Sequence, residues 1–372
     1  MYSKRMYDPE ELILKDSIMR KAYTFITLTA LFTLTACTAA SSAEDIQQPT
    51  PQPAVTVIPT EPAAPLVSED PLPSVTDSIS PPAATPTEIP PHMIYLGDFA
   101  VLSNESFVDL SGVDCTGLDV GAFLDSLTDV KEIRMRDNGL KNDDYAALQD
   151  SHPGIRIIWD IKIKKWTIPT DTVGFSTLRA SEADPRIDND EARYLWYCHD
   201  MVALDLGHNY ISDLSFLEGM PELKIFIIVD NFSYAGSGVR LKDITPIKNC
   251  KKLRYLEMFA NSVEDISVLK DLKELEDLNI CHNPIKSADG IKELPNLKKL
   301  WVYSTSIPSE EIAELKALYP ECTVVTSGSG SVDQGWRGGE RYKAMRNMVK
   351  NNVIDPVYAD SVSGNSVSED AL

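Results

Sequence analysis

Five segments between residues 201 and 307 share one apolar pattern, L-x-x-L-x-L-x-x-N-x-I, although the second lacks the final Ile and the fifth has Thr305 in place of the Asn. The segments begin at Met201, Leu223, Leu253, Leu275 and Leu297. The starts are therefore 22 residues apart, except for one step of 30. Five consecutive copies are very improbable by chance, and a fixed period of this length indicates stacked structural units that each contact only their neighbours.

This pattern is the signature of leucine-rich repeats. In such a unit the L-x-L run is a short strand, the strands of successive units stack in parallel, and the leucines point into a narrow core. We therefore predict an α/β solenoid whose curved parallel β-sheet forms the concave face. A unit of 22 residues leaves little room for an α-helix, so we expect 3₁₀ turns or short helices on the convex face.

Helix-bearing units are expected near both ends of the array. Residues 130–140 match the repeat template, and the helical segment that follows them parallels another segment 167 residues later. Asn142 and Ser309 are suitable N-caps for these helices, and each is followed by two acidic residues that favour the helix dipole. Residues 162–199 interrupt the array, and the sequence there allows either a hairpin or irregular strands.

The asparagine of the pattern is expected to turn inward where each strand ends. There its side chain can satisfy backbone N–H and C=O groups of the adjoining loop that would otherwise be buried unpaired. Stacked units would thus form an asparagine ladder, which is a structural feature. Its predicted members are Asn138, Asn209, Asn231, Asn261 and Asn283.

Strand residues that alternate with the core positions face the opposite side of the sheet. On the predicted concave face they form a continuous apolar and aromatic surface, which usually marks an interaction site, and Tyr and Trp are favoured anchors there. The residues expected to contact a partner are Ile225, Ile227, Val229, Tyr255, Glu257, Phe259, Trp301 and Tyr303. The alternative is that the C-terminal tail or the insertion at residues 232–241 folds over this face.

The N-terminal residues suggest export. Arg20 and Lys21 precede an apolar run, residues 22–36, that is too short for a typical membrane-spanning helix and ends in Leu-Thr-Ala before Cys37. This ending resembles the lipobox of bacterial lipoproteins, in which the cysteine is acylated with fatty acids such as palmitate and becomes the first residue. The resemblance implies lipidation of Cys37; an ordinary signal peptide with an incidental cysteine is the alternative. Acidic residues within positions 1–18 suit no such signal, so the true start could be Met19; a long n-region is the alternative.

These observations divide the chain into five parts. Residues 1–36 are the predicted signal peptide, and residues 37–91 are a Pro/Thr/Ser-rich stalk whose composition predicts disorder. Residues 92–200 form an N-terminal cap with irregular repeats, and residues 201–326 form the leucine-rich repeats. Residues 327–372 are read as a linker, a basic amphipathic helix and a disordered tail.

The chemistry of the chain argues for binding rather than catalysis. A formal net charge of -21 argues against nucleic acid as a partner. We find no motif of a known enzyme class, so we predict no enzyme activity and no cofactor. We also predict no metal site, because His208 and His282, which share a place in their units, should lie about 14 Å apart, at about 4.8 Å per strand.

The repeats resemble the 22-residue class of internalins and related bacterial surface proteins, strongly over residues 201–307 and loosely over residues 130–325. The resemblance implies a concave sheet that binds a protein partner. We therefore expect a lipid-anchored binding protein on the extracytoplasmic face of the bacterial cell membrane, displayed at the cell surface. Two alternatives are a module that binds cell-wall or surface carbohydrate, since aromatic rings also stack on sugars, and a structural scaffold of the envelope.

Overall fold

The computed structural model describes residues 90–177, 185–231, 240–328 and 335–337. The predicted signal peptide, Cys37 and nearly all of the predicted stalk lie outside the described residues. So do most of the insertion at residues 232–241 and the predicted basic helix and tail. None of the helices in the described ranges is both long and apolar enough to cross a membrane.

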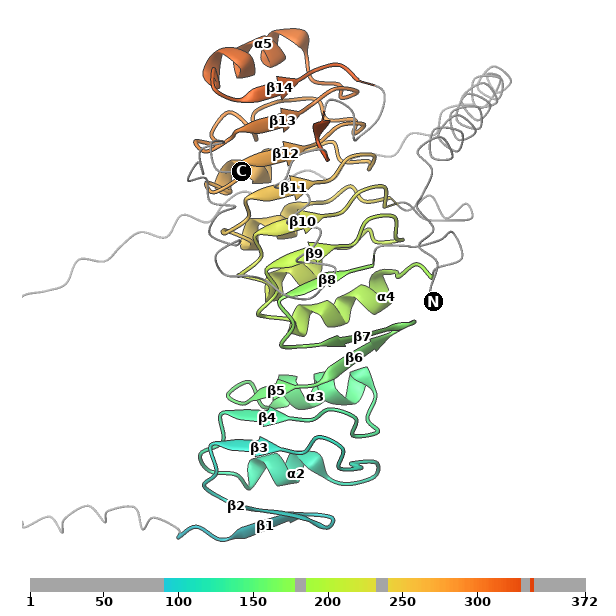
Figure 1. Ribbon diagram of the computed structural model, residues 1–372, viewed down its shortest axis with the longest axis vertical. Helices are drawn as coiled ribbons and strands as arrows, with labels where there is room; N and C mark the ends of the chain where they lie inside the picture. The colour runs from blue at the N-terminus through green and yellow to red at the C-terminus, as the bar shows by residue number, and fades with distance from the viewer. Residues whose placement is uncertain (1–89, 178–184, 232–239, 329–334, 338–372) are drawn as a thin grey trace, which may run out of the picture. The chain divides into compact units, whose positions relative to one another are not determined.

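A seven-stranded parallel sheet forms the repeat region (Figure 1). In spatial order its strands are β8 (Gly174–Ser176), β9 (Ala203–Asp205), β10 (Ile225–Ile227), β11 (Tyr255–Glu257), β12 (Asp277–Asn279), β13 (Lys299–Trp301) and β14 (Thr323–Val325). The central residues of neighbouring strands pair in register, so that Phe226 lies between Leu204 and Leu256. This is the stacking that the sequence repeat predicts.

Three short 3₁₀ helices follow strands on the side away from the sheet, namely η2 (Ser215–Gly219), η3 (Thr245–Asn249) and η4 (Ser267–Asp271). Each begins after an aspartate whose carboxylate accepts the backbone N–H two residues later. These carboxylates belong to Asp213, Asp243 and Asp265, at distances of 2.9, 2.8 and 2.8 Å. A parallel sheet with 3₁₀ turns between its strands confirms the predicted leucine-rich repeat fold.

The N-terminal part is built differently. β1 (Met93–Leu96) and β2 (Phe99–Leu102) form an antiparallel hairpin, and β3 (Phe107–Asp109), β4 (Glu132–Arg134) and β5 (Arg156–Ile158) form a parallel sheet of three strands. Helix α2 (Val120–Asp125) lies between β3 and β4 in the chain, and the Asp119 carboxylate caps it by accepting the Ala122 N–H. Val108 pairs with Ile133, so this cap already has the geometry of the repeat.

The interruption between the two parallel sheets contains a hairpin and a strand that joins the repeat sheet. β6 (Asp160–Ile163) and β7 (Trp166–Pro169) form an antiparallel hairpin, and β8 then starts the seven-stranded sheet. α4 (Asn189–Ala192) and η1 (Arg193–Tyr197) lead into β9. The Asp188 carboxylate accepts the Glu191 N–H and so begins this short helical stretch.

The two predicted terminal helices are present as α3 (Asn142–Ser151) and α5 (Ser309–Leu318). The N-cap assignment was wrong by one residue, because Lys141 and Pro308 hold those positions. Asn142 instead uses its side-chain amide to bind the backbone N–H and C=O of Lys162, each at 2.9 Å. The Asp144 carboxylate accepts the Lys141 N–H at 2.9 Å, which stabilises the first turn of α3.

Two apolar clusters lie on opposite faces of the seven-stranded sheet. The larger one runs along the interior of the stack and contains the leucines of the repeat, such as Leu204, Leu256 and Leu300. The smaller one lies on the other face and contains Tyr255, Trp301 and Trp336. The second cluster contains residues that the sequence predicts to contact a partner.

Candidate functional site

The face of β9–β13 opposite the leucine core carries the residues predicted to bind a partner. The register aligns them in columns, so that Ile225 lies beside Tyr255, Ile227 beside Glu257, and Asn279 beside Trp301. We call this surface the aromatic face. It consists of Ile225, Ile227, Val229, Tyr255, Glu257, Phe259, Trp301 and Tyr303.

The aromatic face is not open to solvent, which differs from the expected exposed surface. Tyr255 and Trp301 are each only 2% exposed, and Glu257 is completely buried. The other five residues of the face are also buried. One reason for the burial of the face is that Trp336, from the C-terminal segment, belongs to the same apolar cluster.

Trp336 packs against two rings of the face. The centroid of its ring lies 4.9 Å from that of Trp301 at an interplanar angle of 61°, and 5.3 Å from that of Tyr255 at 36°. Both separations fall in the range in which aromatic pairs attract. Trp336 itself is only 3% exposed, so its ring is part of the buried cluster.

Arg337 supplies a charge to the same surface. Its Nε and one terminal nitrogen donate to Oε1 of Glu257 at 3.0 and 2.5 Å. Its guanidinium carbon also lies 5.6 Å from the centre of the Phe259 ring. The Tyr255 hydroxyl donates to the other carboxylate oxygen of Glu257 at 2.8 Å, so the buried charge is both paired and hydrogen-bonded.

Gly328 shows that the chain after β14 already runs close to the face. A Cβ at this position would lie 3.0 Å from the ring of Tyr303, which is closer than an ordinary van der Waals contact. Only a residue without a side chain lets the backbone approach this ring without displacing it. The sequence predicted residues from 327 onward as a linker, and its first residues lie beside Tyr303.

The pattern asparagines lie at strand ends and bind loop backbone. The side-chain amide of Asn231 donates to the carbonyl oxygens of Leu206 and Val229 at 2.9 and 3.1 Å, and its Oδ1 accepts the Ile211 N–H at 3.1 Å. Asn261 in turn accepts the backbone N–H of Asn231 at 2.9 Å, which joins adjacent units. Asn138, Asn209 and Asn283 make equivalent bonds to backbone carbonyls.

The residue before each of these asparagines adopts a left-handed backbone conformation. Its φ lies between 49° and 61° at Asp137, His208, Asp230, Ala260 and His282, and Ser304, which precedes Thr305 at the equivalent place in the last unit, has a φ of 54°. Sequence reasoning missed this feature, although the two histidines were recognised as sharing a place. They are turn residues: His208 Nδ1 lies 2.9 Å from the Asp230 carboxylate, and His282 packs edge-on to Tyr303.

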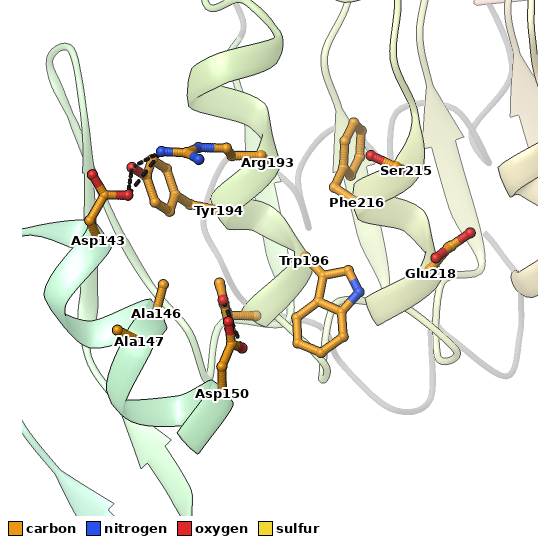
Figure 2. Close-up of a pocket in the computed structure, with 11 residues that line it drawn as sticks. Asp143, Ala146, Ala147, Asp150, Arg193, Tyr194, Trp196, Ser215, Phe216 and Glu218 are labelled. Carbon is orange, nitrogen blue, oxygen red and sulfur yellow. Dashed lines mark hydrogen bonds and ion pairs between the residues drawn. The ribbon is translucent and has the colours of Figure 1, made fainter. Parts of the chain in front are cut away.

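A second feature is a pocket of about 450 Å³ between α3, η1 and η2 (Figure 2). Trp196 is 37% exposed and contributes to its wall. Asp143, Asp150 and Glu218 contribute carboxylates and Arg193 a cation. Sequence reasoning did not single out this pocket, because its residues come from three elements with no shared pattern.

The polar groups of this pocket are already engaged with each other. The Asp143 carboxylate accepts from Arg193 at 2.9 Å and from the Tyr194 hydroxyl at 2.6 Å (Figure 2). The Tyr197 hydroxyl donates to Asp150 at 3.0 Å. Burial, reinforced by that bond, raises the pKa of Tyr197 to about 12, and burial with the Asp143 bond also raises the pKa of Tyr194. Both hydroxyls therefore stay protonated at neutral pH and remain hydrogen-bond donors to the two carboxylates.

Groups of three or more potential metal ligands are absent from the part of the chain that the structure describes. The five cysteines in that part carry free thiols. Burial raises the pKa of Cys198 strongly, that of Cys250 to about 12 and that of Cys322 to about 11. These thiols are accordingly much less ionised at neutral pH than an ordinary cysteine.

The fold is a leucine-rich repeat. Internalin C2 of Listeria monocytogenes is 18% identical with a TM-score of 0.33, over 59% of this chain and 80% of its own. Another internalin of that organism is 17% identical with a TM-score of 0.31, over 59% of this chain and 68% of its own. A leucine-rich repeat protein of Leptospira interrogans is 16% identical with a TM-score of 0.31, over 54% of this chain and 50% of its own. No protein-family model matches the sequence, and no curated protein matches it.

Proposed function

We propose that this protein is an extracytoplasmic binding protein that holds a polypeptide partner on the aromatic face of its repeat sheet. The observation that carries the proposal is the seating of Trp336 and Arg337 on that face. A polypeptide segment far away in the sequence is held there by ring packing and a buried ion pair. The same surface chemistry suits a segment of another protein.

The composition of the face matches what strong protein interfaces use. Aromatic and arginine side chains contribute most of the binding energy at typical interfaces, and they cluster in well-packed, desolvated centres. Here Tyr255, Phe259, Trp301 and Tyr303 provide the rings, and Glu257 provides one charge within them. The buried carboxylate of Glu257 within these rings selects for a partner with a complementary cation.

The proposed place of action is the outer side of a bacterial cell membrane. Support comes from sequence alone: the basic residues before an apolar run, the Leu-Thr-Ala-Cys ending, and the Pro/Thr/Ser-rich segment after it. In this proposal Cys37 carries the lipid and residues 38–91 hold the repeat region away from the membrane. A single acyl group binds membranes only marginally, so stable anchoring requires more than one chain on this residue.

Carbohydrate binding is the second candidate, and the pocket of Figure 2 favours it. An exposed Trp196 ring beside the carboxylates of Asp143, Asp150 and Glu218 offers a stacking surface together with hydrogen-bond acceptors. Sugars use the same two kinds of contact. This candidate predicts a ligand that survives protease treatment of the cell surface and that depends on Trp196.

Retention of the labelled full chain on bacterial surfaces, intact or protease-treated, tests the two candidates. A Cys37→Ser substitution in every sample removes lipid insertion as a cause of retention. One variant has Tyr255, Phe259, Trp301 and Tyr303 replaced by alanine, and a milder one carries the isosteric Glu257→Gln. Trp196→Ala is the matched control, because it removes an aromatic ring away from the aromatic face.

The proposal predicts that retention is lost after protease treatment and in the quadruple variant, is weakened by Glu257→Gln, and is unchanged by Trp196→Ala. Circular dichroism must show that each variant is folded. Protease-resistant retention that disappears with Trp196→Ala would establish the carbohydrate candidate instead. Retention that none of the substitutions changes would refute both.

A further inference from the structure

The aromatic face contains two adjacent subsites, each already filled by one side chain of the same chain. We call Tyr255 and Trp301 the ring subsite and Glu257 with Phe259 the cation subsite. Trp336 fills the first and Arg337 the second. Because the two occupants are neighbours in sequence, one dipeptide binds both subsites at once.

We propose that Trp336 and Arg337 are an internal ligand, and that the partner of this face presents an aromatic residue next to arginine in the same way. The inference rests on the proposed function and specifies its ligand. The partner segment and the internal ligand then compete for one site. The face is available to a partner only in the fraction of molecules in which residues 335–337 have left it.

The cation subsite explains why arginine is required. Glu257 is completely buried, and a buried carboxylate is very unfavourable unless it is paired and hydrogen-bonded. Two Arg337 nitrogens bind one carboxylate oxygen, while the Tyr255 hydroxyl binds the other. The planar guanidinium also faces the Phe259 ring, a contact that favours arginine over lysine. A neutral or acidic residue in this place would leave the Glu257 charge buried and uncompensated.

The ring subsite shows that the internal ligand fits imperfectly. The Trp336 ring is buried, yet its Nε1 has no hydrogen-bond partner among the described residues. A buried donor that gave up water without gaining an acceptor weakens the complex. A partner segment with phenylalanine at this position keeps the ring contacts and has no such donor. The internal ligand can therefore be displaced by a better-fitting segment, as a reversible competitor must be.

Direct binding of a peptide to the full chain tests this inference without any cell-derived partner. The probe is a fluorescent peptide with the sequence of residues 331–342, and the readout is its fluorescence anisotropy. The host variant is Trp336→Ala with Arg337→Ala, which vacates both subsites and leaves the sheet residues intact. We expect the peptide to bind this variant at least tenfold more tightly than it binds the wild-type chain, in which the tethered ligand competes.

Three matched controls locate the binding. A peptide with phenylalanine in place of the tryptophan should bind the variant at least as tightly. A peptide with glutamate in place of the arginine that follows the tryptophan should bind at least tenfold more weakly. Adding Glu257→Gln to the host should remove most of the preference for arginine over glutamate, which a nonspecific apolar contact would leave unchanged.

Equal peptide affinity for the variant and the wild-type chain would overturn the inference, and so would an absence of binding to the variant. The first result means that the peptide binds elsewhere, and the second that the face is no receptor for this dipeptide. Failure of the proposed function looks different. In that case the peptide binds as expected, but opening the face adds no retention on any cell surface.

Discussion

Asn261 lies within the ladder and offers a quantitative test of how the repeats hold together. Its side-chain amide donates to the carbonyl oxygens of Ile228 and Met258 at 2.7 and 2.9 Å, and its Oδ1 accepts the Asn231 N–H at 2.9 Å. Replacement by alanine removes all three bonds. Of the three backbone groups, the Met258 carbonyl keeps the amide of Asn283 at 2.9 Å, so the Ile228 carbonyl and the Asn231 N–H are the two that keep no such second partner among the described residues.

A buried backbone group left without a partner costs about 1–3 kcal/mol. Two such groups give about 2–6 kcal/mol for Asn261→Ala. Asn261 is 5% exposed, so water can reach part of the site, and we expect about 2–4 kcal/mol. Thr305 occupies the equivalent place in the last unit and makes a single bond, from its hydroxyl to the Val302 carbonyl at 2.9 Å. Thr305→Ala should accordingly cost only about 0.5–1.5 kcal/mol.

The measurement is the free energy of unfolding from urea denaturation, followed by far-ultraviolet circular dichroism at one pH for all variants. Asn261→Asp adds a third point, because its carboxylate still accepts the Asn231 N–H but cannot donate to Ile228 and Met258. It should be at least as destabilising as Asn261→Ala at neutral pH. A loss below about 1 kcal/mol for Asn261→Ala, or one no larger than for Thr305→Ala, would refute the ladder argument.

Three further predictions concern backbone geometry and pH. Ser304 is exposed with a φ of 54°, so Ser304→Gly should raise the free energy of unfolding in urea by about 0.5–1 kcal/mol, and a decrease would contradict this. A Cβ on Gly290 would lie 1.9 Å from the Ile266 carbonyl oxygen. Gly290→Ala should therefore lower the free energy of unfolding by at least about 2 kcal/mol in the same assay. An unchanged urea midpoint would contradict this, because it would mean that the backbone moves aside without a loss of stability. Burial raises the pKa of Cys250 from 9.0 to about 12, so the folded chain keeps this proton while the unfolded chain loses it. Between about pH 8.5 and 10.5 the wild-type chain should therefore lose about 2 kcal/mol more stability than Cys250→Ala, and parallel pH profiles would contradict the assignment.

The repeats could be predicted from the sequence because the pattern itself encodes their geometry. Leucines at fixed spacing define the core side of β9 to β13, and the observed register pairs Leu256 with Phe226 and Leu278. The helices α3 and α5 were found from their acidic first turns. Both N-caps lie one residue earlier than predicted, and at α3 the side chain of Asn142 binds the backbone of β6 instead.

Strand β8 was expected only as part of a hairpin or as an irregular strand, because it lacks the repeat pattern. Phe175 pairs with Leu204, but Thr177 takes the next core place, where the following unit has Leu206. The Thr177 hydroxyl accepts from the Asn209 amide at 2.6 Å, so a polar group is satisfied inside the stack. A pattern of leucines gives no sign of such a substitution, since the compensating partner is 32 residues away.

From the sequence, coverage of the aromatic face by the C-terminal tail could be predicted only as an alternative to an open binding surface. Sequence periodicity assigned Tyr255, Glu257 and Trp301 to one face but could not reveal that Trp336 and Arg337 reach it. That contact joins residues 80 positions apart, and no repeat relates them. The tail was predicted to be basic, while its target depended on the buried carboxylate of Glu257, whose burial no local pattern encodes.

The central claim is that the aromatic face binds polypeptide and that its own C-terminal segment competes there. The most direct test compares cell-surface retention of three full-length proteins that all carry Cys37→Ser. These are the otherwise unchanged chain, the chain with Trp336→Ala and Arg337→Ala, and the latter with Trp301→Ala added. The account predicts that retention rises when the internal ligand is removed and falls below the unchanged chain when Trp301 is also lost. Equal retention of all three proteins would contradict it.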